Sequence, residues 1–189
     1  MIKFIHTGDL HLGLRFKNSS FPKDIASNRR VELWHTLERI VDKAIVENMD
    51  FLFIAGDLFE DEYFTLGDMK RLKSTLERAK NVEIIITAGN HDNLNKNSLY
   101  HMVDWPEHIS IFHNKGWDKA ENHKNIFVNF QGLDLDKNNI LIIHGDIFSK
   151  DSVYLSLDKN YLNSLGFDYI ALGDIHNPEI FSNKPAYCG

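Results

Sequence analysis

Five short apolar runs, each followed within a few residues by a glycine and a residue that can bind a metal, constrain the fold of this chain most strongly. They are rich in Ile, Phe and Leu, which is typical of strands that are buried on both faces and end in a tight turn. In open α/β sheets, ligands bind beyond the carboxyl ends of the strands, so loops from distant parts of the chain can converge there. The runs span residues 2–5, 51–55, 84–86, 140–143 and 169–172.

The polar residues that follow these runs can bind metal through carboxylate, imidazole or amide groups. Two divalent ions about 4 Å apart need several ligands each and one bridging group, and the two oxygens of a carboxylate can bridge them. Asp57 is the natural bridge, and a ligand set without thiolate favours Mn²⁺, with Mg²⁺, Fe and Zn²⁺ as alternatives. One such residue alone is usually a turn former or a surface residue, but five fragments together indicate a two-metal phosphoesterase site. The candidate ligands are Asp9, His11, Asp57, Asn90, His144, Asp174 and His176.

These motifs, in the order Gly-Asp-x-His, Gly-Asp, Gly-Asn-His-Asp, His-Gly and Gly-x-x-His, resemble the calcineurin-like metallophosphoesterase superfamily. Residues 9–13, 56–59 and 169–173 look most like the SbcD and Mre-eleven family of DNA double-strand-break repair nucleases, and the resemblance spans nearly the whole chain. It implies an α/β fold in which a sandwich of two β-sheets is flanked by helices. It also implies that Asp9, His11, Asp57 and His176 bind a first metal, and that Asp57, Asn90 and His144 bind a second.

The same resemblance implies that His91 is the catalytic imidazole. A protonated His near the leaving oxygen can donate the proton that this oxygen needs, and an imidazole is suited to that role near neutral pH. The alternative is a His that only caps a turn. Glu60 lies three residues after Asp57, where related phosphatases place an acid that orients this His, and we expect the same here. Its alternative is a solvated loop carboxylate.

Asp174 departs from the family pattern, which usually has Gly-His-x-His at this point, with the first His binding the second metal. A carboxylate can bind Mn²⁺ or Mg²⁺, but it is shorter and offsets more of the metal charge, which makes the metal a weaker Lewis acid. Our hypothesis is that Asp174 still binds metal and biases activity toward Mn²⁺. A degraded second site and an introduced substitution are the alternatives.

Helical stretches are expected between the strands. The first runs from about Ser27 to Glu47, where Ser27 or Asn28 could form the cap and Val31, Trp34 and Ile45 belong to an apolar stripe. The second runs over about residues 66–80, and residues 151–165 favour a third. Residues 93–129 read as loops and short strands. This alternation of strands and helices predicts an α/β architecture.

The 189 residues, with 43% hydrophobic content, are expected to form a single metallophosphoesterase domain, residues 1–189. A single cysteine favours a reducing compartment, and the start of the chain lacks a secretion signal, so a cytoplasmic location is expected, with no membrane association. The family's capping domain and the region that binds an SbcC-type ATPase are expected to be absent from this chain. The oligomeric state stays open, with a homodimer among the alternatives.

A net charge of −6 is unusual for a protein that binds nucleic acid. Residues 14–30, however, contain five basic residues against one acidic residue, a net charge of +4, and this loop could follow a DNA backbone. A solvated loop before a helix is the alternative. The candidate DNA contacts are Arg15, Lys17, Lys23, Arg29 and Arg30.

The predicted function is that of a Mn²⁺-dependent DNA phosphodiesterase, an exonuclease or single-strand endonuclease of the SbcD type that acts in DNA repair. The first alternative is a small-molecule phosphodiesterase or phosphatase of the same superfamily, which the acidic charge favours. The second is a weakly active or inactive subunit that tethers DNA or binds a partner, because Asp174 replaces the usual His.

Overall fold

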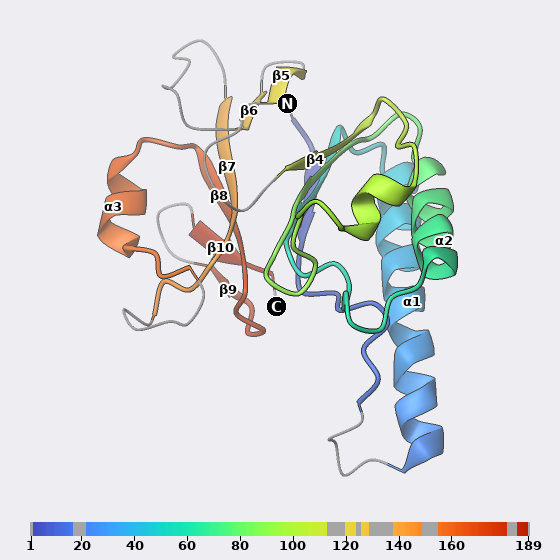
Figure 1. Cartoon of the computed structure of the whole chain (residues 1–189). Helices are drawn as coiled ribbons and strands as arrows, with labels where there is room; N and C mark the ends of the chain where they lie inside the picture. Colours follow the sequence, from blue (N-terminus) through green and yellow to red (C-terminus); the bar gives the residue numbers. More distant parts are fainter. Residues whose placement is uncertain are drawn as a thin grey trace.

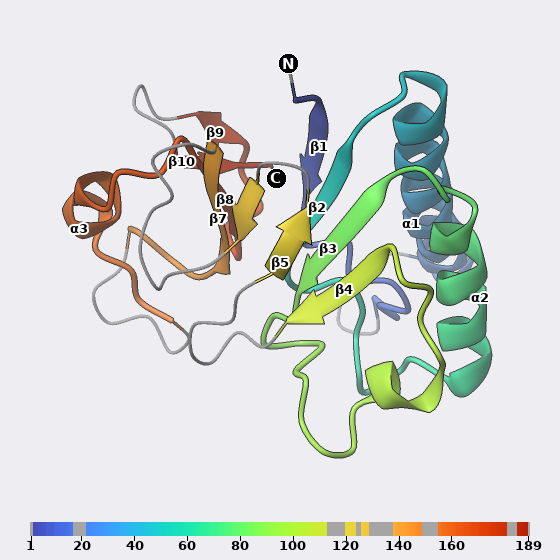
Figure 2. The same cartoon turned by 90° about the horizontal axis from the view of Figure 1, so that it is seen from above.

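The two β-sheets lie face to face in the computed structural model of the chain, with helices on the outer faces (Figures 1 and 2). Strands β2 and β3 of the first sheet contact β7 and β8 of the second. The structure describes residues 2–16, 22–112, 120–123, 126–128, 138–148, 155–180 and 185–188. This arrangement confirms the predicted α/β sandwich.

The first sheet is parallel and follows the chain order β1-β2-β3-β4. Because all four strands run the same way, the loops after β1, β2 and β3 leave from one edge of the sheet. Two helices connect these strands, α1 (Lys23–Val46) and α2 (Leu66–Glu77). The strands are β1 (Phe4–Thr7), β2 (Phe51–Ala55), β3 (Glu83–Thr87) and β4 (Ile109–Phe112), and a short helix, η1 (Leu99–Met102), precedes β4.

The second sheet has the order β5-β6-β7-β8-β10-β9 and is parallel at its centre, where β7 pairs with β6 and β8. β10 is parallel to β8, whereas β5 and β9 are antiparallel edge strands. The helix α3 (Lys159–Ser164) precedes β8. The strands are β5 (Ala120–His123), β6 (Ile126–Val128), β7 (Asn138–His144), β8 (Tyr169–Gly173), β9 (Glu179–Ile180) and β10 (Pro185–Tyr187).

Alternating side chains of the central strands divide the core into three layers. Leu52 and Ile54 of β2 pack under α1 and α2, whereas Phe51 and Phe53 of the same strand face the second sheet. In β7, Ile140 and Ile142 face the first sheet, and Leu141 packs on the outer side toward α3. This period of two in strands buried on both faces explains why their sequences read as unbroken apolar runs.

The helices differ from the sequence prediction mainly at their ends. α1 begins at Lys23, and neither Ser27 nor Asn28 caps it; Pro22 occupies the N-cap position and makes no side-chain cap hydrogen bond. Val31 and Ile45, expected in the apolar stripe, are 50% and 38% exposed. The apolar stripe predicted more buried positions on α1 than the structure has. Apolar spacing indicates that a segment is helical, whereas the extent of the neighbouring sheet decides which turns of the helix are buried.

The other two predicted helices are present but shorter. α2 ends at Glu77 and has a capping box, in which the Thr65 hydroxyl accepts from the backbone N–H of Asp68 and the Asp68 carboxylate accepts from that of Thr65. The third helix covers residues 159–164 of the predicted 151–165, and residues 151–154 lie outside the described part. Between 93 and 129, the described residues form short strands and loops, as predicted, and also the short helix η1, which was not predicted.

Candidate metal centre

The candidate ligands follow strands β1, β2, β3 and β8, with His144 at the end of β7, so the two sheets meet around them. Backbone hydrogen bonds join the first two loops, from Asp9 N to Gly56 O (3.1 Å) and from His11 N to Asp57 O (2.9 Å). Asp9, His11, Asp57 and Asp174 all have positive φ, between 43° and 98°. Such left-handed backbone is unusual for residues other than glycine, and strained residues of this kind cluster at functional sites.

Two glycines allow the sheets to approach closely at this point. A Cβ atom on Gly173 would lie 1.8 Å from the Ala55 carbonyl oxygen, and one on Gly56 would lie 2.3 Å from His144 Nδ1. Gly56 also has a φ of 82°, which L side chains rarely adopt. Gly56 and Gly173 are therefore required because the two sheets approach closely here, and Gly56 is also required by the backbone conformation of its turn.

His11, His176 and Asp9 form the first group of possible ligands. Their donor atoms all lie within 4.8 Å of one another, and the Nε2 atoms of His11 and His176 are 3.1 Å apart. The Asp9 carboxylate is almost fully buried and accepts the backbone N–H of Asp174 at 3.0 and 3.1 Å. The ring of His176 is 61% exposed, so this group opens to solvent on one side.

Asp57 lies between the first group and a second one around His144. Its Oδ2 atom is 3.8 Å from His11 Nε2 and 3.4 Å from His144 Nε2, a position compatible with the predicted bridge. Asn90 Oδ1 is 3.0 Å from the same His144 nitrogen, and Asp174 Oδ1 is 3.7 Å from it. Asp9 also lies within 4.8 Å of the Asp57 and His144 ligand atoms, so the two groups share two carboxylates.

Glu60 connects His11 with His91. Its Oε1 atom accepts from His11 Nδ1 at 2.7 Å, and its Oε2 atom accepts from His91 Nδ1 at 2.9 Å. Glu60 is only 8% exposed, which rules out the alternative of a solvated loop carboxylate. One carboxylate therefore fixes the orientation of two imidazoles, and sequence reasoning foresaw only the contact with His91. The ring of His91 is 39% exposed, so it can meet a ligand.

Burial and charge shift the pKa values within the two groups in opposite directions. Burial raises the pKa of Asp9 and of Asp174. Burial also acts to raise the pKa of Asp57, but the hydrogen bond and charge of His144 outweigh it and the pKa is lowered. Burial acts to lower the pKa of His144, yet the hydrogen bond and charge of Asp57 raise it to about 9. The cluster therefore favours positive charge at its centre.

These residues fit a pair of divalent cations. His144 Nδ1 lies 2.9 Å from the Ala55 carbonyl oxygen, which holds one hydrogen on Nδ1 and leaves Nε2, 3.0 Å from Asn90 Oδ1, as the nitrogen that can exchange its proton for a cation. In the same way, Glu60 holds the Nδ1 hydrogen of His11 and directs its Nε2 atom toward His176. Acceptor atoms about 3 Å apart repel each other unless a proton or a cation lies near both, and hard oxygen and imidazole donors suit Mn²⁺, Mg²⁺, Fe or Zn²⁺.

Asp92 organises the site, a role that sequence reasoning missed. This carboxylate has no exposed surface and accepts hydrogen bonds from Asp57 N (3.1 Å), Leu58 N (3.0 Å), Gly89 N (2.6 Å) and the Tyr100 hydroxyl (2.7 Å). Burial raises its pKa to about 6, partly offset by these donors. The only sequence signal is its place in the Gly-Asn-His-Asp motif. Asp92 ties the loop that carries Asp57 to the loop that carries Asn90 and His91.

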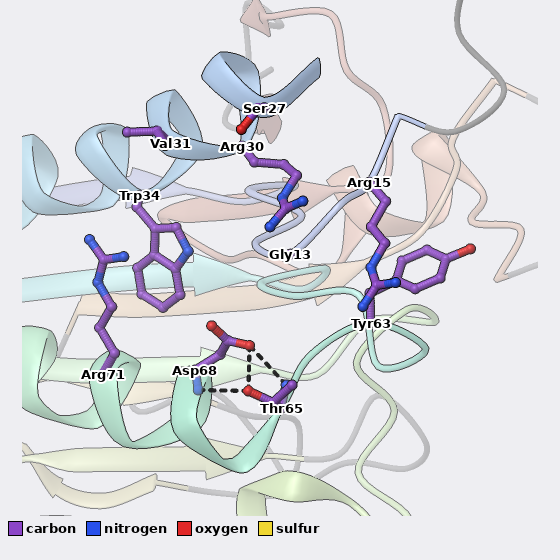
Figure 3. Close-up of a pocket in the computed structure, with 10 residues that line it drawn as sticks. All are labelled: Gly13, Arg15, Ser27, Arg30, Val31, Trp34, Tyr63, Thr65, Asp68 and Arg71. Atoms are coloured by element: carbon purple, nitrogen blue, oxygen red, sulfur yellow. Dashed lines mark hydrogen bonds between the residues drawn. The ribbon is translucent and has the colours of Figure 1, made fainter. Parts of the chain in front are cut away.

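The structure describes the side chains of three of the five candidate DNA contacts, and these three lie in two places. Arg15 and Arg30 line one pocket, whose wall also contains Gly13, two residues after His11 (Figure 3). Arg29 instead pairs with Glu32 at 3.1 Å on the exposed face of α1. Lys17 lies outside the described residues, and Lys23 is described only as the first residue of α1.

Comparison with known proteins agrees with this geometry. The sequence matches the calcineurin-like phosphoesterase family over residues 2–183. The chain belongs to this family. Its members bind two divalent metals, and the groups described above are the residues of this chain that could hold them. Hydrolysis of phosphoesters is the chemistry for which the family is named. None of the helices in the described ranges is long and apolar enough to cross a membrane.

Two individual proteins are similar to this chain in sequence. The chain is 27% identical to the uncharacterized metallophosphoesterase YhaO of Bacillus subtilis, over 96% of this chain and 50% of the relative. It is 33% identical to the DNA double-strand break repair protein Mre11 of Archaeoglobus fulgidus, over 54% of this chain and 22% of the relative. The chain thus spans half or less of the length of these two relatives.

A solved structure gives a weaker match. The nuclease MPE of Pseudomonas putida aligns with a TM-score of 0.35 and 15% identity, over 76% of this chain and 60% of that one. A likeness of this size carries no argument about function.

Proposed function

We propose that this chain is a Mn²⁺-dependent DNA phosphodiesterase of the SbcD type, with exonuclease or single-strand endonuclease activity. The observation that carries the proposal is the position of His91, whose Nδ1 is held by Glu60 at 2.9 Å and which lies within 4.8 Å of possible ligand atoms of His11 and Asp57. The identity of 33% to a DNA double-strand break repair protein over 107 residues supports DNA as the substrate.

Each residue has a definite task in this proposal. Two divalent ions, when bound, polarise the phosphodiester and lower the pKa of water. Glu60 accepts the Nδ1 hydrogen of His91 and leaves Nε2 directed at the substrate, where it donates a proton to the leaving oxygen. The backbone N–H of His91 donates to Asp57 Oδ1 at 2.9 Å, so the imidazole and the bridging carboxylate keep a fixed separation. Pre-set positions of this kind lower the entropic part of the barrier.

The test is cleavage of end-labelled single- and double-stranded DNA with Mn²⁺, with a chelator arm and a chromogenic phosphodiester assayed in parallel. His91→Ala should lower the rate of DNA cleavage by about 10²–10⁴-fold, the usual contribution of a general acid. His35→Ala is the matched control, because His35 is an exposed His on α1. The chelator should abolish cleavage by the native chain.

The small-molecule phosphodiesterase is the alternative with a specific observation behind it, the net charge of −6. Turnover of the chromogenic ester without cleavage of either DNA would establish this alternative and overturn the proposal. An absence of turnover on every substrate would instead favour an inactive subunit that binds DNA or a partner. Equal activity of His91→Ala and the native chain would contradict only the role assigned to His91 and would leave the rest of the proposal standing.

A further inference from the structure

A pocket of about 310 Å³ lies between α1, the loop after β1 and the start of α2 (Figure 3). Its wall includes Gly13, two residues after the candidate ligand His11, and Tyr63, whose backbone N–H donates to Glu60 O at 2.9 Å. Two residues of chain span at most about 7 Å. A substrate strand bound at the metal centre therefore has this pocket as a direct neighbour.

The floor of the pocket belongs to the same hydrogen-bonded loops as the metal centre. Leu12 donates its N–H to Leu58 O at 3.0 Å, and its carbonyl accepts from Glu60 N at 3.0 Å. These bonds fix the loop after β1 against the loop after β2. The position of Gly13 and Tyr63 in the pocket wall relative to His11, Asp57 and Glu60 is thus set by backbone contacts.

Arginine and aromatic residues make up half of the residues that line the pocket. The Arg15 guanidinium lies over the Tyr63 ring, 5.0 Å from its centroid, and Arg71 lies 4.2 Å from the centroid of Trp34. Arg71 is also paired with Glu38 at 2.9 Å. Such stacking holds guanidinium groups in place while their N–H donors stay available.

The pocket wall contains three arginines and one carboxylate, so positive charge is in excess. Neither the Arg15 nor the Arg30 guanidinium forms an ion pair with a described residue. The one carboxylate in the wall, Asp68, is engaged by the backbone N–H and hydroxyl of Thr65 at 3.0 and 2.6 Å. Figure 3 shows the Arg30 side chain extending from α1 toward Gly13. The pocket therefore combines two guanidinium groups suited to a phosphate with a half-buried aromatic face.

We infer that this pocket binds a nucleotide of the substrate strand adjacent to the cleaved phosphodiester. Arg15 and Arg30 hold its phosphate, and Tyr63 stacks with its base. The paired N–H groups of a guanidinium donate hydrogen bonds to phosphate oxygens. Stacking of a base on an aromatic ring does not depend on which base is present, as a nuclease that cleaves many sequences requires. This inference rests on the proposed function, because it assumes that DNA occupies the metal centre.

The first test measures binding of a fluorescent single-stranded oligonucleotide in chelator, so that no cleavage occurs, at several salt concentrations. Arg15→Gln/Arg30→Gln should weaken binding at least tenfold and reduce the slope of log K against log salt by about 0.7, the value for one lost phosphate contact on a single strand. Tyr63→Leu should weaken binding about tenfold with the slope unchanged. The control Arg39→Gln/Lys43→Gln removes the same charge from exposed positions of α1 outside the pocket.

The second test is the ratio of kcat/KM for the oligonucleotide to kcat/KM for the chromogenic diester. The Arg15/Arg30 variant should lower this ratio at least tenfold, whereas the control should stay within twofold of the native chain. If the native chain cleaves DNA and the Arg15/Arg30 variant matches the control in affinity, slope and ratio, the pocket inference is wrong and the nuclease proposal stands. If the native chain hydrolyses only the chromogenic diester and does not bind the oligonucleotide, both are wrong.

Discussion

Asp174 is the residue at which this chain departs most clearly from the motif of its family, and the structure places it inside the site. Its backbone N–H donates to both Asp9 carboxylate oxygens, and its own Oδ1 atom lies 3.7 Å from His144 Nε2. Its side chain is 12% exposed. A residue that had lost its role would be expected to turn toward solvent, whereas this carboxylate faces the group predicted to hold the second metal.

We therefore predict that Asp174→Gly weakens binding of the second Mn²⁺ by about 10- to 100-fold, measured by isothermal titration. Glycine is the right replacement, because it retains the φ of 98° and removes only the carboxylate. Asp61→Ala is the control, since it removes an exposed carboxylate close to Glu60. Unchanged affinity for both ions in Asp174→Gly would show that this carboxylate is not a ligand.

At the level of secondary-structure elements, the site depends on contacts that join the loop after β2 to the loop after β3. Asp92 makes two of these from one carboxylate, which accepts from the backbone N–H groups of Asp57 and Leu58, and it also accepts from Gly89 N within its own loop. Removal of the carboxylate would leave three buried N–H donors without a partner, at about 1–3 kcal/mol each. The two loops would then lose the contact that sets the distance from Asp57 to Asn90.

Asp92→Ala should consequently lower the free energy of unfolding by about 3 kcal/mol or more, as measured by urea denaturation. Asp104→Ala provides the comparison, because Asp104 is exposed and its removal should change stability by less than about 0.5 kcal/mol. A loss below 1 kcal/mol in Asp92→Ala would mean that water or a shifted loop replaces the carboxylate.

The elements differ in how far sequence could predict them. The strand ends were predictable, because an apolar run followed by glycine and a polar residue is a local signal, and β2 covers the expected residues 51–55. The start of α1 and the exposure of Val31 were not, because they depend on how far the sheet extends beneath the helix. The contact of Glu60 with His11 and the bonds from Asp57 and Leu58 to Asp92 join residues 34 to 49 positions apart in sequence, which no local pattern encodes.

For the whole molecule, the important fact is that the candidate ligands come from both sheets. His11 and Asp57 lie on loops of the first sheet, whereas His144 and His176 belong to the second. Family membership shows that the fold brings such loops together, and here they approach closely enough for two histidines to lie 3.1 Å apart. Bound ions would therefore join the two halves of the sandwich, in addition to any part they play in catalysis.

This linkage predicts that Mn²⁺ raises the thermal midpoint of unfolding and that a chelator reverses the effect. A ligand that binds only the folded state stabilises it by about 2.7 kcal/mol when its concentration is 100 times its Kd. Asp57→Asn should lose most of this response, because the amide keeps the shape of the side chain but cannot bridge two cations through two anionic oxygens. Asp104→Asn, an exposed change of the same kind, should respond like the native chain. An equal rise in midpoint for Asp57→Asn and the native chain would mean that the stabilising ions bind elsewhere, and the two sheets would then be held together by their apolar core and by direct hydrogen bonds such as that from Asp174 N to Asp9.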